Sequence, residues 1–194
     1  MNTITRQSEF VAASPSMTLN RGQTLETFVK GEEHASAYDS LRSFAESRGT
    51  VSGLRPHLAF LHGGPGLGKT HLLQAMAHCY IKTGVAVRIW RGEELVRAYV
   101  ESGSMEQFTT THLPHSGKAA LLVDGLHHAV VVREFAEGLF SLLGSFIRRQ
   151  CPVVITARTS PSALAKEHPE LLSLCKGGLV VELPTLSFAT RLAF

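Results

Sequence analysis

The stretch His57-Leu-Ala-Phe-Leu-His62-Gly-Gly-Pro-Gly-Leu-Gly-Lys69-Thr70 decides the fold. Its first six residues are mostly apolar and predict a buried strand, and the periodic apolar positions after Thr70 predict a helix. Between a strand and a helix, Gly-x-x-x-x-Gly-Lys-Thr is typical of a loop that wraps phosphate groups. Its glycines let backbone N–H groups point inward, and the helix start presents its positive end to the same anion. The alternative is a glycine-rich turn that holds no ligand, and the complete pattern in this context disfavours it.

The loop defines most of a predicted nucleotide site, with ATP or ADP and Mg²⁺ as its ligands. We expect Lys69 to reach the terminal phosphates and the hydroxyl of Thr70 to bind Mg²⁺. His71 follows directly, and packing in the first helical turn is favoured over contact with phosphate. A dinucleotide fingerprint is excluded, because its pattern fails at residue 69, which is lysine. The predicted phosphate-binding residues are Gly63, Gly64, Gly66, Leu67, Gly68, Lys69, Thr70 and His71.

A second apolar run, Ala120-Leu-Leu-Val-Asp124, ends in an acid. We expect Asp124 to hold the Mg²⁺ through water. Enzymes that hydrolyse the nucleotide usually place another carboxylate next, to orient the attacking water, whereas the next residue here is Gly125. Glu134 is expected to be a solvated helix charge. The pattern therefore predicts nucleotide binding with weak or no hydrolysis, and catalytic residues stay unknown.

Composition limits the class of protein. The 194 residues, 44% hydrophobic, suit one domain with a proper core, and a formal charge of +3 does not by itself indicate nucleic acid. No apolar run approaches the ~20 residues that span a bilayer, so no membrane association is expected. Cys79, Cys151 and Cys175 lack zinc-site spacing and are predicted to be reduced residues in or near the core. We expect a cytoplasmic protein.

The organisation of the chain is that of an α/β domain. Residues 1–23 lack periodicity and are expected to be poorly ordered, with the core in residues 24–194. An amphipathic helix closed by Gly49 and a loop with Gly53 and Pro56 precede the first strand. Helical patterns separate the apolar runs, which predicts a mainly parallel sheet covered on both faces. The predicted strands are Leu58–His62, Val85–Trp90, Ala119–Asp124, Pro152–Ala157 and Leu179–Leu183.

Two helices of this pattern are especially regular. The first follows the phosphate loop and the second stops before Pro152, and in both the apolar residues recur at spacings of three and four. Their predicted buried stripes are Leu72, Leu73, Met76, Cys79 and Tyr80 in the first, and Phe135, Leu139, Leu142, Leu143, Phe146 and Ile147 in the second.

Several stretches together resemble the AAA+ nucleotide-binding domain of the bacterial replication initiator DnaA and its shorter relative Hda. The resemblance runs from about Leu25 to Phe194 and is more specific than the loop alone. Its motifs are Thr-Leu-Glu-Thr-Phe-Val-Lys-Gly (24–31), Gly-Leu-Gly-Lys-Thr-His-Leu-Leu (66–73), Met-Glu-Gln-Phe (105–108), Leu-Leu-Val-Asp (121–124), and Pro184-Thr-Leu through Thr190-Arg-Leu-Ala193.

The resemblance implies a P-loop NTPase core of three layers around a five-stranded sheet, with ATP at a subunit interface. It implies that Phe28 and Val29 lie against the adenine and that Thr156 belongs to the nucleotide site as a sensor. In the family, ATP binding controls assembly on origin DNA. The region corresponding to residues 91–108 holds single-stranded DNA, and Arg91 and Arg97 are candidates there, although a solvated helix face is the favoured interpretation. Stacking of bases on Trp90 or Phe108 is a weaker alternative to a core position.

The departures from the family pattern fall on active features. Gly125 replaces an acid, Arg158 replaces the aspartate of the sensor, and Leu174 stands where an arginine finger is expected. The helical lid and the helix-turn-helix domain would follow Phe194, so we expect both to be missing. Binding of duplex origin DNA in the manner of the initiator is therefore not expected.

Three functions remain after these observations. The leading hypothesis is a nucleotide-dependent binding module that acts in, or regulates, replication initiation, with replication proteins or a full-length initiator as partners. An active ATPase like DnaC or the transposition helper IstB is the main alternative, and a degenerate initiator copy is the third. A metal site at the His112 and His115 pair or at His127 and His128 is disfavoured, because no carboxylate cluster accompanies them.

Overall fold

The computed structural model describes residues 17–47, 57–112, 119–187 and 190. Its centre is a five-stranded sheet in the order β2-β3-β4-β1-β5, in which all neighbouring strands pair in parallel. The predicted α/β architecture is confirmed, and the observed strands lie within one residue of the predicted ones. They are β1 (Leu58–His62), β2 (Ala86–Arg91), β3 (Ala119–Asp124), β4 (Val153–Ala157) and β5 (Leu179–Glu182).

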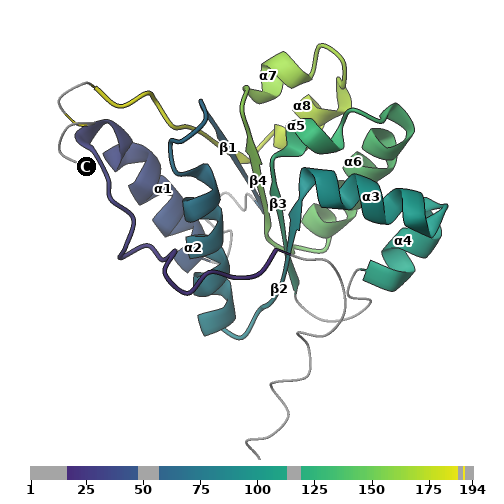
Figure 1. Cartoon of the computed structure of the whole chain (residues 1–194), viewed down its shortest axis with the longest axis horizontal. Helices are drawn as coiled ribbons and strands as arrows, with labels where there is room; N and C mark the ends of the chain where they lie inside the picture. Colours follow the sequence, from purple (N-terminus) through teal and green to yellow (C-terminus); the bar gives the residue numbers. More distant parts are fainter. Residues whose placement is uncertain (1–16, 48–56, 113–118, 188–189, 191–194) are drawn as a thin grey trace, which may run out of the picture.

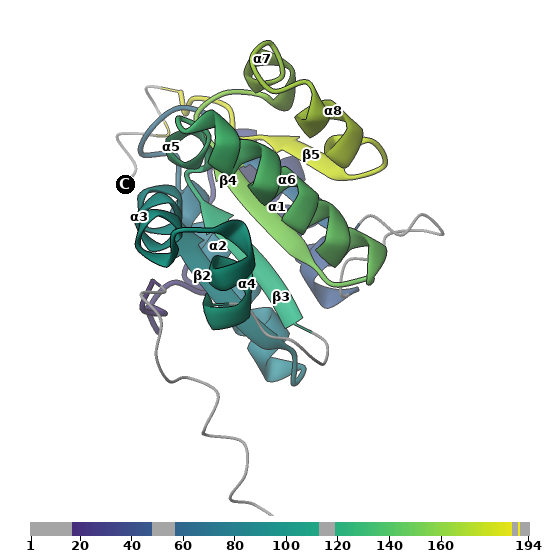
Figure 2. The same cartoon turned by 90° about the vertical axis from the view of Figure 1, so that its right-hand side faces the viewer.

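Helices cover both faces of this sheet (Figure 1). One layer contains α1 (Ala35–Glu46), after the short 3-10 helix η1 (Glu32–His34), and α2 (Lys69–Lys82). The other contains α3 (Gly92–Ser102), α4 (Met105–His112), α5 (Leu126–Ala129), α6 (Arg133–Arg148), α7 (Pro161–Leu164) and α8 (Glu170–Cys175), with α6 crossing the sheet in Figure 2.

Alternation along the strands divides the core between the two layers. In β1, Ala59 and Leu61 join the cluster under α1 and α2, whereas Leu58 and Phe60 join the cluster under α6. Because side chains point to opposite faces in turn and both faces are covered, the three inner strands β1, β3 and β4 are apolar at nearly every position, whereas the edge strands β2 and β5 carry exposed polar residues such as Arg91 and Glu182. This is why the inner strands read as continuous apolar runs in the sequence.

The predicted stripes of the two regular helices are largely buried. In α6, Phe135, Leu139, Leu143 and Phe146 are buried, and Leu142 and Ile147 are partly buried. Leu72, Leu73, Met76 and Tyr80 of α2 are fully buried, and Cys79 is half-buried. Helix α6 ends at Arg148, and Gln150 then takes a left-handed φ of 58° before β4 begins. Cys151 and Cys175 are buried, and all three cysteines are free, as expected.

The segment before residue 24 contributes more to the core than predicted. Met17 is buried, and its N–H donates to the carbonyl of Ile89 on β2 at 3.0 Å. The N–H of Asn20 donates to Oε1 of Gln74 on α2 at 2.7 Å. Because β2 is an edge strand with unpaired backbone groups, a neighbouring segment can bind along it. The expectation of disorder is wrong for residues 17–23, whereas residues 1–16 lie outside the described part.

Other expectations also fall outside the described residues. The predicted helix stop at Gly49 and the loop containing Gly53 and Pro56 are among them, as are His115 and the stretch 191–194. No helix of the described residues is long and apolar enough to cross a membrane.

Candidate nucleotide-binding site

The phosphate loop joins β1 to α2 at the carboxyl edge of the parallel sheet, where α/β proteins place their ligands. Gly68 has a left-handed φ of 87°, and a Cβ at this position would lie 2.6 Å from the ring of Phe28. Gly63, with a φ of 149°, packs against the carbonyl of Leu183 so closely that a Cβ would overlap it. Two of the predicted loop glycines are therefore required by backbone conformation and by space.

Lys69 begins α2 and points back into the loop. Its Nζ donates to the carbonyls of Gly63 at 2.8 Å and Gly64 at 2.5 Å. Burial lowers the pKa of this amine, Asp124 opposes the shift, and the charge of Arg158 adds to it. The ammonium group therefore lies among the backbone groups that would surround a phosphate.

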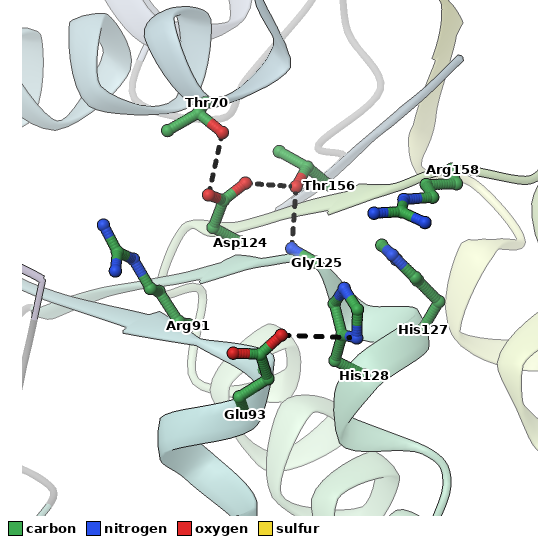
Figure 3. Close-up of a pocket in the computed structure, with 10 residues that line it drawn as sticks. Thr70, Arg91, Glu93, Asp124, Gly125, His127, His128, Thr156 and Arg158 are labelled. Atoms are coloured by element: carbon green, nitrogen blue, oxygen red, sulfur yellow. Dashed lines mark hydrogen bonds and ion pairs between the residues drawn. The ribbon is translucent and has the colours of Figure 1, made fainter. Parts of the chain in front are cut away.

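Asp124, at the end of β3, accepts hydrogen bonds from two other predicted site residues, Thr70 and Thr156. Thr70 Oγ1 on α2 donates to Oδ2 at 2.8 Å, and Thr156 Oγ1 on β4 donates to Oδ1 at 2.6 Å (Figure 3). The N–H of Gly125 donates to Thr156 Oγ1 at 2.9 Å. Hard oxygen donors of this kind suit Mg²⁺, which is usually bound through one or two carboxylates plus phosphates. The three predicted side chains come together although they are far apart in the sequence.

Basic side chains line the same pocket beyond Asp124. Arg91 pairs in register with Asp124 across β2 and β3, and Arg158 follows β4 (Figure 3). Arg91 therefore lies at a strand end beside the candidate site, and the predicted helix-face position applies only to Arg97 on α3, which is exposed. His127 also lines the pocket.

The two adjacent histidines differ in their surroundings. His128 Nδ1 lies 3.5 Å from the Glu93 carboxylate. Burial, followed by the charges of His128 and Arg158, lowers the pKa of His127, whose ring nitrogens have no hydrogen-bond partner among the described residues. Among those residues no group of three or more histidines, cysteines and acids could hold a metal ion.

The entry segment lies on the other side of the α2 start. The Phe28 ring packs edge-on against His71 at 5.3 Å and stacks on Tyr38 at 5.9 Å. His71 Nε2 lies 2.9 Å from the carbonyl oxygen of Thr24, so the histidine holds this segment against the start of α2. Val29, next to Phe28, is 64% exposed. A second pocket is lined by residues that include Phe28, Val29, Gly66, Leu67, Gly68 and His71.

Several other predicted positions have clear places. Trp90 and Phe108 are fully buried, so their rings are core residues and do not face a nucleic acid. Glu134 is exposed on α6, as expected. Leu174 packs against the core from α8.

The sequence interpretation did not assign Arg91, His127 and Arg158 to this pocket. A usable signal existed for two of them, because Arg91 ends β2 and Arg158 follows β4, and the carboxyl ends of parallel strands share one edge. His127 depends on how the short helix α5 turns after Gly125, where φ is 78°. Strand periodicity carries no information on that turn.

Comparison with known proteins identifies the family to which this chain is similar. Residues 19–182 match the family model described as the bacterial DnaA ATPase domain. The chromosomal replication initiator protein DnaA of Nautilia profundicola is 27% identical over 169 residues, which are 87% of this chain and 38% of the relative. This chain therefore spans well under half the length of that relative.

Solved structures give the same result. Domain III of the DnaA protein from Thermotoga maritima is similar with a TM-score of 0.77 and 26% identity, covering 91% of this chain and 72% of that one. A replication initiator DnaA bound to AMPPCP and single-stranded DNA is similar with a TM-score of 0.74 and 26% identity, covering 89% of this chain and 53% of that one.

Proposed function

We infer that this chain, which belongs to the bacterial DnaA ATPase domain family, binds ATP or ADP together with Mg²⁺. The observation that carries this proposal is the hydrogen-bonded group of Thr70, Asp124 and Thr156 beside Lys69. Thr70 and Asp124 would hold Mg²⁺, and the loop backbone and Lys69 would bind the phosphates. A family structure bound to AMPPCP supports the choice of an adenine nucleotide. Phe28 and Val29, beside the loop, would contact the adenine.

Hydrolysis would be weak or absent. Gly125 follows Asp124, so no carboxylate stands there to orient water, and its N–H is directed at Thr156. Glu93 lines the pocket as well, but its carboxylate faces His128. The nucleotide would therefore stay bound as a ligand without being hydrolysed to drive a reaction.

The proposed role is a nucleotide-dependent binding module that acts in, or regulates, DNA replication initiation. The names of the relatives support this role, and the chain corresponds to a minority of their length. Replication proteins or a full-length initiator are the proposed partners. Single-stranded DNA is a candidate ligand because one family structure contains it, and the exposed Arg97 on α3 is a candidate contact.

Binding and turnover measured on one preparation test the proposal. Fluorescent ATP and ADP should bind in the presence of Mg²⁺, and Lys69→Ala should weaken both by at least about tenfold, since the loop loses its charge-assisted contact with phosphate. Lys82→Ala is the matched control, because this exposed lysine lies at the other end of α2. Phosphate release should stay at background.

The other outcomes separate the rival functions. Rapid phosphate release that is lost in Asp124→Asn would support an active ATPase of the DnaC or IstB kind. Absence of nucleotide binding by the unaltered protein would support a degenerate copy of the initiator.

A further inference from the structure

Arg158 occupies a central position at the carboxyl edge of the sheet. It follows β4, and β4 lies between β1, which leads into the phosphate loop, and β3, which ends in Asp124. A phosphate held between the loop and Asp124 would therefore face the end of β4. Figure 3 shows the Arg158 guanidinium turned toward this pocket, next to His127 and on the side opposite Arg91.

The guanidinium is close enough to act on the phosphate-binding groups. Its charge contributes to the lowered pKa values of both Lys69 and His127, in each case after burial. Among the described residues no carboxylate forms an ion pair with Arg158, because Asp124 binds Thr70 and Thr156 and Glu93 lies against His128. An exposed arginine without an acidic partner remains available to an anion.

The two pockets set the direction in which a nucleotide would lie. They meet at the start of α2: Gly66, Leu67, Gly68 and His71 belong to the pocket with Phe28, and Thr70 belongs to the pocket with Asp124 and Arg158. A nucleoside beside Phe28 would place its phosphates along the loop, and the last phosphate would lie in the second pocket. The end of ADP would stop one phosphate short of that position.

We propose that Arg158 binds the terminal phosphate of a nucleoside triphosphate held by the same chain, and so makes the site selective for ATP over ADP. The inference rests on the proposed function. Arginine suits the task, since its planar guanidinium forms two parallel hydrogen bonds to phosphate oxygens and stays charged at all physiological pH values. Arg158 would bind the phosphate and would not activate a water molecule, so selectivity for ATP would not bring hydrolysis.

Dissociation constants for ATP and ADP, measured with Mg²⁺ by fluorescence titration, test the proposal. The unaltered protein should bind ATP more tightly than ADP. Arg158→Ala should raise the dissociation constant for ATP by about tenfold or more, while the dissociation constant for ADP changes less than about twofold. Arg158→Lys should recover part of the ATP affinity, because it keeps the charge and loses the paired hydrogen bonds. Arg149→Ala removes an equal charge at the exposed end of α6 and should change neither constant.

The outcomes distinguish this inference from the proposed function. Equal weakening of ATP and ADP in Arg158→Ala, or an unchanged ratio of the two constants, overturns the role of Arg158 while nucleotide binding stands. If the unaltered protein binds neither nucleotide, the proposed function fails and the inference fails with it. Because Arg158 is exposed, thermal unfolding of Arg158→Ala without nucleotide should match that of the unaltered protein.

Discussion

The hydroxyl of Thr156 is buried and makes two hydrogen bonds in the site. The side chain is 1% exposed, and its oxygen donates to Asp124 and accepts the N–H of Gly125. It thereby fixes both the direction of the carboxylate and the turn that follows β3. The Thr156 hydroxyl therefore shapes the site by orienting other residues, in addition to any contact that it makes with a ligand.

Replacing Thr156 by valine keeps the shape and removes the hydroxyl. The N–H of Gly125 and one oxygen of Asp124 then lose their partner, so we expect the free energy of unfolding to fall by about 1–3 kcal/mol. Urea unfolding at neutral pH measures the loss. Thr159→Val, at an exposed position three residues later, is the control and should have the same urea midpoint as the unaltered protein. Identical urea midpoints for the two variants would contradict the role given to the buried hydroxyl.

The sequence predicts some residues of the candidate site much better than others. The loop pattern identifies Lys69 and Thr70, because glycine conformation and phosphate chemistry restrict the residues that can stand there. Asp124 follows from an apolar run that ends in an acid. The sequence assigned Thr156 only through the family resemblance and noted Arg158 only as a departure from it. The strand order brings Thr156 and Arg158, on and after β4, to the pocket that contains Asp124.

Helix α3 begins at the closest backbone approach near the site. A Cβ on Gly92 would overlap the carbonyl oxygen of Gly125 and lie 3.0 Å from the N of Ala129. Both obstacles are backbone atoms, which cannot rotate away as the end of a side chain can. The absence of a side chain at Gly92 therefore allows α3 to pack on the start of α5, directly beside Asp124.

Gly92→Ala should force these two helices apart. We expect a loss of about 1–3 kcal/mol in the free energy of unfolding, as for other overpacked positions, measured by urea unfolding. Gly22→Ala is a suitable control, because Gly22 is exposed and its nearest obstacle is the side chain of Asn20 at 3.3 Å. A Gly92→Ala protein as stable as the Gly22→Ala protein would show that the contact between α3 and α5 relaxes without cost.

Elements were easier to predict than their contacts. Burial on both faces makes the inner strands β1, β3 and β4 nearly continuous apolar runs, and turn residues bound all five strands, which is why the predicted and observed strands agree within one residue. The segment containing Met17 was missed, because its order depends on β2 being an edge strand and not on any periodicity of its own. Local pattern determines an element, whereas the order of the strands determines which segments it can bind.

Across the whole molecule, distant parts of the chain meet at the carboxylate of Glu33. Its Oε1 accepts hydrogen bonds from the N–H of Ser187 at 3.0 Å and from Thr190 Oγ1 at 3.1 Å. These contacts join the residues before α1 to the segment after β5. The backbone N–H of Glu33 itself, followed by the N–H and hydroxyl of Ser187, lowers the pKa of the carboxyl to about 2.

This depressed pKa makes the junction sensitive to acid. The ordinary pKa of a glutamate carboxyl is 4.5, so the charged form stabilises the folded state above about pH 4.5, and that contribution disappears as the pH falls from 4.5 toward 2. Glu33→Gln lacks the charge at every pH. We therefore expect the unaltered protein to exceed the variant in stability most at pH 5 and above, and the gap to narrow at pH 4 and again at pH 3.

Urea midpoints at pH 7, 5, 4 and 3 measure this gap. Glu32→Gln, in the same short helix, is the matched control, because it removes one acid at an exposed neighbouring position. The difference between the two variants isolates the contacts of Glu33 from the general effect of lost charge. A gap that stays constant over the four pH values would mean that Glu33 holds Ser187 and Thr190 by hydrogen bonds whose strength does not depend on ionisation, and that the charge adds nothing to the junction.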